Sequence, residues 1–544
     1  MPIGEVLRDF ANWSTVGGVP HIANAKSVVV RVFWSVVVAF LLSIFLYQLI
    51  SMIRTFLSYP STVNTEIIVA TQPFPAITIC NLNAYKVLPS SNPFLTDLNA
   101  FMEHYQKIVD EDPSEPDTYG LKGLNTTFQR DSRAKDALNM LAAGHTAADK
   151  ESSLYTYDDL IADCTFNGRT CTSANFTELI DPVYGRCFTF NNDANSTLSV
   201  SRAGKTFGLR MLITVHQTNQ ECNETLFQPL TTLAGAKISV QSPQEYPSLE
   251  GTALTVGVGY TTAIAITSAE YVLAKKPYGE CVDNQADDLN YYKDYLYTSL
   301  TCFNGCRQRD AYNHCSCYNP RYLGPDGATF CPLNITTVTC LDSLKGDQSG
   351  VMKNLDPLTD CGCMPACEEK TYALTTSLSH FPTDNYAIAA TDITNTSNPL
   401  TSGSCTEGNP QFSSKEQCET WYSMNGLQLQ VYFETMRSEL YTQVSSYGLS
   451  TMINDLGGQA GLYLGLSIVS IIECFGLLIM LCAYCVSGGK VMIRPYDDDF
   501  DGDPRLMDGD LEDVKKVGEG EEDDEENAEK TGEEKKEEEE KVRE

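Results

Sequence analysis

Two long apolar stretches, one near each end of the chain, constrain the fold most. The stretch from Val32 to Ile53 carries no charge and is bracketed by Arg31 and Arg54, and the stretch from Leu456 to Val486 contains Glu473 as its single charged residue. Each is long enough to cross about 30 Å of hydrocarbon as a helix. The first stretch lacks the small-residue cleavage site of a removable signal peptide. The sequence therefore predicts two membrane spans.

Cysteines and glycosylation sequons predict the orientation of these spans. Of the 20 cysteines, 17 lie between the two stretches, from Cys80 to Cys418. This density is typical of disulfides in an oxidising compartment. The same segment contains sequons for N-glycosylation at Asn125, Asn175, Asn195, Asn223, Asn334 and Asn395. We therefore expect a protein of the plasma membrane with a large extracellular domain and both termini in the cytosol.

The net charge of −33 is concentrated in the C-terminal tail. About half of it lies after Pro495, in runs such as EGEEDDEENAEK. Such runs cannot bury enough apolar surface to fold, so residues 487–544 are expected to be a disordered cytosolic tail. No basic, aromatic-interleaved segment indicates nucleic acid. No catalytic triad or metal-ligand cluster indicates an enzyme, and no cofactor or metal is expected.

Between the spans, the pattern predicts a mixed α and β domain. Alternating residues in Gly208–Gln217 and Leu427–Glu434 are typical of half-buried strands, and Gly251–Ile266 is also β-rich. Pro93–Ala148 and Ser299–Tyr312 have helix-like composition. The segment after the first span, from Phe56, is expected to be a linker that leads into a strand.

The second stretch carries features that a simple membrane anchor does not need. Gly457, Gly461 and Gly465 recur every four residues and would line one face of a helix, which allows helices to approach closely in lipid. In a symmetric assembly Asp455 would form an acidic ring that attracts cations. The carboxylate of Glu473 is costly inside a membrane unless it faces water, a partner or an ion path. These charges favour a pore.

The same stretch closely resembles the pore helix of the degenerin, epithelial sodium channel and acid-sensing channel superfamily. The resemblance rests on the Gly-Gly-Gln of Gly457–Gln459 and the Gly-x-Ser of Gly465–Ser467. Phe74–Lys86, Tyr184–Asn191 and Pro277–Cys281 are similar to other family segments in the same order. The resemblance covers nearly all of the chain from Gly17 to Gly476, except the divergent finger region and the tail.

The resemblance implies a trimeric, two-span α-helical membrane protein with a large, disulfide-rich α+β extracellular domain of palm, knuckle, finger, thumb and β-ball. The expected segments are a cytosolic head with a re-entrant Gly-Gly segment (1–27), the first transmembrane helix (28–54), the extracellular domain (55–450, with a finger at about 88–160 and a thumb at about 278–370), the transmembrane pore helix (451–486) and the tail (487–544).

The resemblance also implies seven disulfides, since spacing alone does not give connectivity. The implied pairs are Cys80–Cys187, Cys164–Cys171, Cys281–Cys367, Cys302–Cys363, Cys306–Cys361, Cys315–Cys340 and Cys317–Cys331. The spacing of Cys302 and Cys306 by one helical turn agrees with two neighbouring rungs in the thumb. Cys405 and Cys418 are a plausible additional pair, which leaves Cys222 unpaired or intermolecular.

The site residues that follow from the resemblance form a sodium pore. The chain would assemble as a homotrimer, or as a heterotrimer with paralogous subunits, and amiloride-type compounds would block it. The expected selectivity filter is Gly465, Leu466 and Ser467, and the expected pore and gate residues are Asn454, Asp455, Gly457, Gly458, Gly461 and Glu473. Gly17, Gly18 and His21 match the cytosolic re-entrant segment, with Gly17 where the family has histidine. Tyr59 and Tyr278 match an aromatic pair that couples gating to the extracellular domain.

The sequence leaves open which stimulus activates the channel. The head segment Gly18–Lys26 is most similar to invertebrate FMRFamide-gated sodium channels, so an extracellular neuropeptide is the first expectation. A pocket for it would use acidic and aromatic finger residues such as Glu103, Tyr105, Asp110 and Tyr119. Proton gating, mechanical gating and constitutive opening are the alternatives. Further alternatives are an ATP-gated trimeric channel, which would want extracellular lysines for phosphate, and a non-conducting two-pass receptor.

Overall fold

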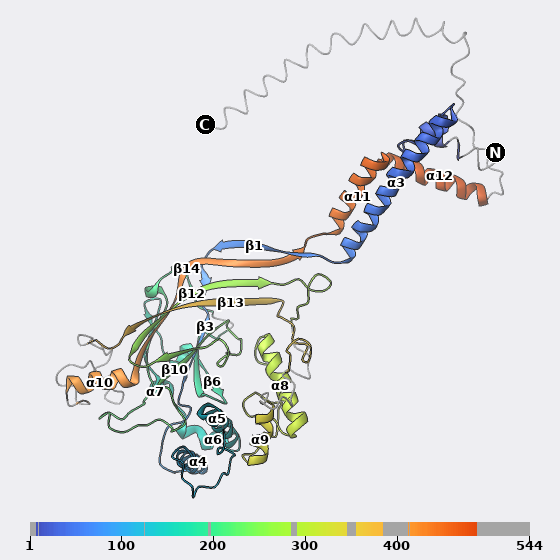
Figure 1. The fold of residues 1–544 in the computed structure, drawn as a ribbon. Helices are drawn as coiled ribbons and strands as arrows, with labels where there is room; N and C mark the ends of the chain where they lie inside the picture. Colours follow the sequence, from blue (N-terminus) through green and yellow to red (C-terminus); the bar gives the residue numbers. More distant parts are fainter. Residues whose placement is uncertain are drawn as a thin grey trace, which may run out of the picture. The chain divides into compact units, whose positions relative to one another are not determined.

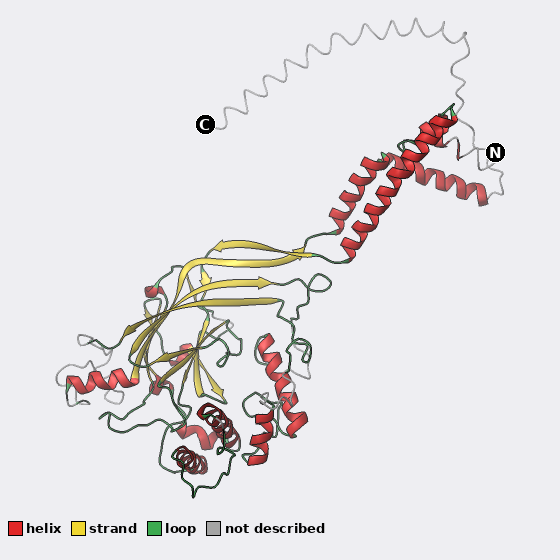
Figure 2. Cartoon of the chain, in the orientation of Figure 1, coloured by secondary structure: helices red, strands yellow, loops and turns green. Residues whose placement is uncertain are grey.

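The computed structural model describes residues 7–8, 10–12, 14–124, 126–193, 197–283, 291–344, 355–383, 412 and 414–486. The chain divides into two compact units. The terminal unit combines Met1–Ser58 with Gly448–Glu544, and the central unit is Tyr59–Tyr447. We describe each unit by itself (Figures 1 and 2).

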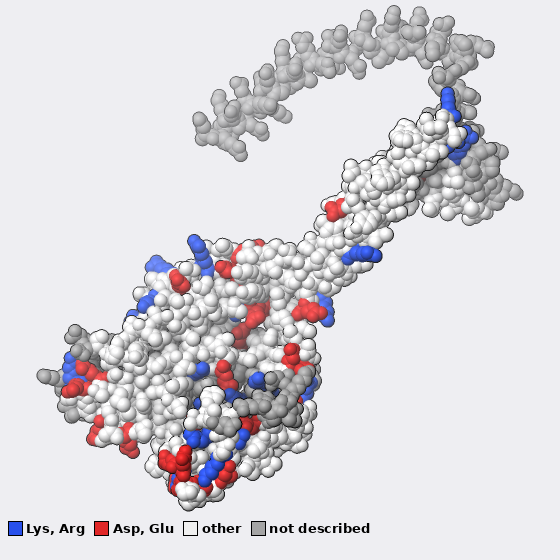
Figure 3. All heavy atoms as spheres, viewed as in Figure 1, with Lys and Arg blue, Asp and Glu red and all other residues white. Residues whose placement is uncertain are grey.

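The terminal unit is helical. Its elements are α2 (Val19–Asn24), α3 (Val28–Leu57), α11 (Leu449–Leu464) and α12 (Ile468–Val486). Among the described residues α3 is long and apolar enough to cross a membrane, whereas α11 and α12 meet that condition as a pair bent by 82° at their junction. Figure 3 shows a surface over α3 and α11 that is almost free of charged side chains. The expected continuous helix over 451–486 is therefore interrupted at 465–467.

Strands dominate the central unit. They are β1 (Ser61–Val69), β2 (Gln72–Pro73), β3 (Ala76–Asn81), β4 (Ile161–Phe166), β5 (Arg169–Thr170), β6 (Phe176–Asp181), β7 (Gly185–Phe190), β8 (Ser199–Val200), β9 (Leu209–Thr214), β10 (Gly235–Gln241), β11 (Leu254–Gly257), β12 (Tyr260–Val272), β13 (Glu368–His380) and β14 (Gly426–Ser445). One sheet has the order β13-β12-β14-β9-β4-β5, with β1 paired to β14. A second has the order β11-β10-β3-β7-β6, and β2 pairs with β8.

The core between the two larger sheets explains the sequence alternation. The first half of β14 alternates buried and half-buried residues, and Leu427, Leu429, Val431 and Phe433 all enter one apolar cluster with β3 and β9. Burial of a large aliphatic or aromatic side chain contributes about 1.5–3 kcal/mol, so this cluster fixes the register of β14.

After the first apolar helix we expected a linker that leads into a strand, and the linker is short because β1 already begins at Ser61. β1 pairs antiparallel with the second half of β14, from Ser61 opposite Ser445 to Val69 opposite Arg437. All nine residues of β1 are exposed, so no alternation of burial marks the strand in the sequence. The pairing brings together the strand that follows α3 and the strand that precedes α11 in the chain.

Helices surround the sheets in the finger and thumb regions. They are α4 (Pro93–Val109), α5 (Thr127–Ala143), α6 (Ala147–Lys150), α7 (Tyr157–Leu160), α8 (Ser299–Cys315), α9 (Ile335–Ser343) and α10 (Lys415–Asn425), with 3₁₀ turns at Glu151–Ser153, Ser173–Asn175 and Lys205–Phe207. Asn92, Thr126, Thr298 and Asn334 accept hydrogen bonds as N-caps, which fixes where the long helices begin. Apolar residues of α4, α5 and α9 share one core.

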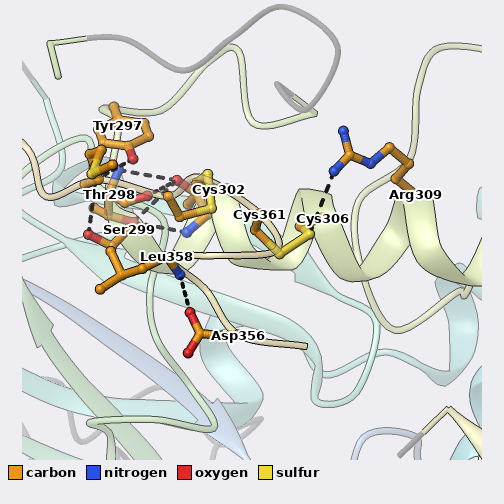
Figure 4. The surroundings of a disulfide bond; sticks show 12 residues. Tyr297, Thr298, Ser299, Cys302, Cys306, Arg309, Asp356, Leu358 and Cys361 are labelled. Carbon is orange, nitrogen blue, oxygen red and sulfur yellow. Dashed lines mark hydrogen bonds between the residues drawn. A yellow bond between two sulfur atoms is a disulfide. The ribbon is translucent and has the colours of Figure 1, made fainter. Parts of the chain in front are cut away.

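All seven disulfides implied by the resemblance are present in the central unit. Cys302 and Cys306 lie on α8 and form disulfides with Cys363 and Cys361, respectively. The two disulfides are neighbouring rungs within one small buried cluster (Figure 4). Cys418 is also disulfide-bonded, and Cys405, the partner expected for it, lies outside the described residues. Cys222 is a free, half-buried thiol.

Three of the six predicted glycosylation sites can be located. Asn175, Asn223 and Asn334 are exposed on the central unit. Asn125, Asn195 and Asn395 lie outside the described residues, as does the acidic tail from residue 487.

Candidate functional site

The break between α11 and α12 consists of the three residues that we expected to form the filter. Gly465 ends α11 in the left-handed conformation with φ 60°, which only glycine adopts without strain. The side chain of Ser467 accepts a hydrogen bond from the backbone N–H of Ser470 at 3.2 Å, so Ser467 acts as the N-cap of α12. Gly465 therefore terminates the helix and does not extend the face of Gly457 and Gly461, as the four-residue spacing had suggested.

The N-terminal segment Thr15–Gly17 contacts this break. The backbone N–H of Gly17 donates to the carbonyl of Leu464, the last residue of α11, at 2.8 Å. A Cβ at Gly17 would lie 2.9 Å from the same oxygen, closer than side chains tolerate. The contact therefore requires glycine at position 17, the position where the family that the chain resembles carries histidine.

A polar chain joins the same segment to α12. The backbone N–H and the hydroxyl of Thr15 both donate to Oε2 of Glu473 at 3.0 Å. The Thr15 hydroxyl also lies 2.6 Å from the Ser470 hydroxyl, which accepts from the backbone N–H of Ser467 at 3.1 Å. Glu473 is thus linked through two hydroxyl groups to Ser467, one of the three residues expected to form the filter. Sequence reasoning selected Glu473 but missed Thr15 and Ser470.

Gly18 and His21 anchor the segment to the first long helix. Gly18 has φ 83° and precedes α2, and a Cβ there would lie 2.4 Å from Val38 of α3. The His21 ring stacks on Trp34 of α3, with ring centroids 4.6 Å apart. His21 therefore contacts α3 and not the helix break.

The remaining expected pore residues lie on α11. Asn454, Asp455, Gly457 and Gly458 are exposed there, and a Cβ at Gly457 or Gly458 would meet no atom within 4 Å. A Cβ at Gly461 would lie 3.6 Å from the Leu466 carbonyl, where the chain leaves the helix.

The aromatic pair Tyr59 and Tyr278 meets in the central unit. Their rings lie edge to face with centroids 5.5 Å apart. Gln443 of β14, which was not predicted from the sequence, forms hydrogen bonds beside the same pair. Its amide donates to the hydroxyl of Ser61 at 2.8 Å and accepts from the backbone N–H of Ala274 at 3.1 Å. The joint therefore links β1, β14 and the start of the thumb.

The four finger residues named for a peptide pocket do not line one cavity among the described residues. Tyr105 is buried in the finger core, and its hydroxyl donates to Asp131 at 2.8 Å. Glu103 forms an ion pair with Lys107, and Asp110 caps the end of α4. Tyr119 packs edge to face on His104.

Comparisons with known proteins identify the family of the chain. The family described as "Amiloride-sensitive sodium channel" matches residues 10–477. The chain is 45% identical to the Caenorhabditis elegans protein named degenerin-like protein asic-2, over 94% of this chain and 92% of that protein. It is 29% identical to degenerin deg-1 of the same species, over 69% of this chain but 45% of that protein, and 27% identical to mouse acid-sensing ion channel 4, over 86% and 78%.

A disulfide-stabilised domain between two apolar helical segments, one of them broken by a glycine, defines the class of membrane channel subunits and not a class of enzymes. The chain belongs to the amiloride-sensitive sodium channel family, which includes the degenerins and the acid-sensing ion channels. As a member, it is a subunit of a multimeric sodium channel of the plasma membrane.

Proposed function

We propose that three copies of this chain form an amiloride-sensitive, sodium-selective pore whose filter is Gly465–Ser467. Both termini are cytosolic in this proposal, and the central unit is extracellular and glycosylated. The broken α11–α12 pair counts as the second span.

The helix break carries this proposal. Irregular backbone at membrane depth leaves carbonyl and N–H groups without partners, and it is tolerated only where it lies in protein or lines a water-filled path. Here the break lies at the carbonyl end of α11, which is the negative end of the helix dipole. The Leu464 carbonyl accepts a hydrogen bond from Gly17, and each carbonyl oxygen has a second lone pair that can face a cation. Carbonyl oxygens at such a constriction can replace part of the hydration shell of a cation.

One orphaned group supports assembly with further copies. The side-chain oxygen Oε1 of Gln459 is buried but has no hydrogen-bond partner among the described residues. A buried acceptor without a partner costs about 1–3 kcal/mol. A neighbouring copy around a central axis would supply the donor.

Voltage clamp of cells that express the chain tests the proposal. We expect a sodium current that amiloride blocks. A bulky residue in place of Asn454 should enlarge this current, because bulky residues at the corresponding position tend to hold the channels of this family open. Absence of any amiloride-sensitive current in both the wild type and the Asn454→Phe variant, with the protein detected at the cell surface, would contradict it.

The proposed stimulus is an extracellular peptide of the FMRFamide type. The support for a peptide is the similarity of the head segment Gly18–Lys26 to the peptide-gated channels. No single cavity among the described finger residues adds support for a peptide site. Application of the amidated tetrapeptide should open the channel within one exchange of solution. If acid or membrane stretch opens the channel and the peptide does not, the corresponding alternative replaces the peptide.

Protons are a second candidate, favoured by Glu245. Burial raises the pKa of Glu245 to about 7, although the backbone N–H of Ser242 donates to it at 3.2 Å and lowers the pKa in part. Glu245 lies between β10 and β11, and its neighbour Tyr246 packs on Tyr292 at the start of the thumb. A carboxyl that titrates near neutral pH in this place can couple protonation to the thumb.

The pH dependence of stability checks this assignment. The folded chain holds a proton on Glu245 up to about pH 7, whereas the unfolded chain releases it near the reference value of 4.5. The folded state therefore binds more protons in this window, so the contribution of Glu245 to stability falls as pH rises from 4.5 to 7. We expect Glu245→Gln to raise the free energy of unfolding at pH 8 by about 1–2 kcal/mol after allowance for solvent screening, and to change little at pH 4. The exposed Glu224→Gln is the control, and an equal effect of both variants at pH 8 would contradict the assignment.

The hydroxyl of Thr15 provides a separate test of the polar chain. Thr15→Val keeps the shape of the side chain but removes the link between Ser470 and Glu473. Loss of a hydrogen bond to a charged group costs about 1.5–3 kcal/mol, so we expect a clear decrease of the sodium-to-potassium permeability ratio. Thr15→Ser, which retains the hydroxyl, should behave as wild type. Equal ratios in Thr15→Val and wild type would show that the hydroxyl has no such role.

A further inference from the structure

A cavity in the central unit has no role in the proposed pore. It has a volume of about 370 Å³, within the range of small-molecule sites. It lies between the finger helix α5, the segment Leu82–Tyr85 that leads into the finger, the β6–β7 turn, and the edge formed by β10 and β11. A ligand here would contact finger, sheet and Arg321 of the thumb region at once.

The lining of this cavity combines polar residues with several large apolar side chains. Leu138 and Leu230 are buried and form part of the wall. Phe128 and Leu233 also line it, although they are 80% and 59% exposed. Large apolar side chains with this exposure beside a cavity are typical of a binding site and unusual for a plain surface.

The charged groups of the cavity divide into paired and unpaired sets. Arg321 binds Asp136 at 3.1 Å and pairs with Glu250, and Asp131 accepts from the Tyr105 hydroxyl. Of the two carboxylates that line the wall, Glu250 is compensated by Arg321, and Asp131 by Arg130, whose Nε lies 3.9 Å away.

Two lysines are not compensated in this way. Lys135 of α5 is exposed and has no carboxylate within ion-pair distance in the described part of the chain. Lys237 of β10 is half-buried, and its ammonium donates to the Thr255 hydroxyl at 3.2 Å. Burial lowers the pKa of Lys237 despite the nearby charge of Glu250, so its cation lacks a full set of stabilising partners. Two positive charges beside exposed apolar side chains select for an amphipathic anion.

We propose that this cavity binds a small amphipathic anion, a carboxylate or sulfonate on an aromatic or aliphatic body. Lys135 and Lys237 hold the anionic group, and Phe128, Leu138 and Leu233 contact the apolar body. The bound molecule links α5 to the β10–β11 edge and so stabilises the finger against the sheet. The site goes beyond the proposed pore and also differs in charge from a site for an arginine-containing peptide amide.

Direct binding tests the site without any measurement of current, so its failure would leave the proposed channel function unaffected. The probes are naphthalene-2-sulfonate and its neutral analogue naphthalene-2-sulfonamide, titrated calorimetrically into the full chain in lipid nanodiscs, with empty nanodiscs as blank. We expect the sulfonate to bind more tightly than the sulfonamide. Lys135→Gln with Lys237→Gln should weaken the sulfonate by roughly tenfold or more and leave the sulfonamide unchanged.

Two further variants make the result specific. Lys205→Gln with Lys293→Gln removes two exposed lysines outside the cavity and should leave binding of both probes unchanged. Leu233→Asp places a negative charge beside the cavity and should weaken the sulfonate. Equal affinity for the two probes, equal loss in both lysine pairs, or binding no greater than to empty nanodiscs would overturn the proposal.

Discussion

Gly17→Ala is expected to abolish the discrimination between sodium and potassium, or the current itself, although it adds one methyl group. The added Cβ would lie 2.9 Å from the backbone carbonyl oxygen of Leu464, and since the position of a Cβ is set by its own backbone, neither atom can rotate away. The N-terminal segment must then move and lose the 2.8 Å hydrogen bond from Gly17 to Leu464. Overpacking of this kind costs about 1–3 kcal/mol, which reduces the population of the bound segment by a factor of roughly 5–150.

The matched control for this prediction is Gly476→Ala. It adds the same methyl group to α12, where a Cβ would meet no atom within 4 Å. The measurement is the permeability ratio from reversal potentials in sodium and potassium solutions. A normal ratio in Gly17→Ala would show that the segment does not support the filter.

Removal of both thumb rungs should destabilise the central unit far more than removal of either one. Cys302–Cys363 and Cys306–Cys361 span 61 and 55 residues and close nearly the same loop. While one rung remains, the loop stays closed and the unfolded chain gains little entropy. When both are removed, Cys281–Cys367 still closes an outer loop of 86 residues, so the loss of constraint is smaller than for a free loop and amounts to roughly 2–3 kcal/mol. The quadruple alanine variant should therefore unfold at a markedly lower temperature than either double variant.

The control for the rungs is the pair Cys164→Ala and Cys171→Ala, which opens a loop of 7 residues. Thermal unfolding of the full chain under non-reducing conditions gives the comparison. Additive effects of the two rungs would contradict the shared-loop explanation, and it would then have to be replaced by independent local contributions.

Strands with one buried face could be predicted from the sequence, and strands without one could not. The alternation in the first half of β14 marks it because Leu427 to Phe433 enter the core. β1 shows no alternation because all of its residues are exposed, and its pairing partner lies more than 360 residues away in the chain. The disulfide pairs could be assigned only through the resemblance, since spacing leaves many connectivities possible.

The Gly-x-Ser pattern identified the segment proposed as the filter, but the conformation of this segment was not predicted. The spacing of Gly457, Gly461 and Gly465 is equally compatible with a continuous helix, and only the structure places Gly465 at φ 60°. Thr15 escaped detection because its contact with Glu473 spans 458 residues and carries no periodic signal. Gln443 was not predicted either, because polar residues are common in the exposed part of a strand and give no signal of a functional contact.

The most direct test of the central claim is the reversal potential of the amiloride-sensitive current when external sodium is replaced by potassium, compared between wild type and Ser467→Ala with Gly17→Ala. We expect a strongly sodium-selective wild type and a variant whose reversal potential no longer shifts on the exchange. An unselective wild-type current, or a variant as selective as wild type, would contradict the claim that the helix break and the segment bound to it form the filter.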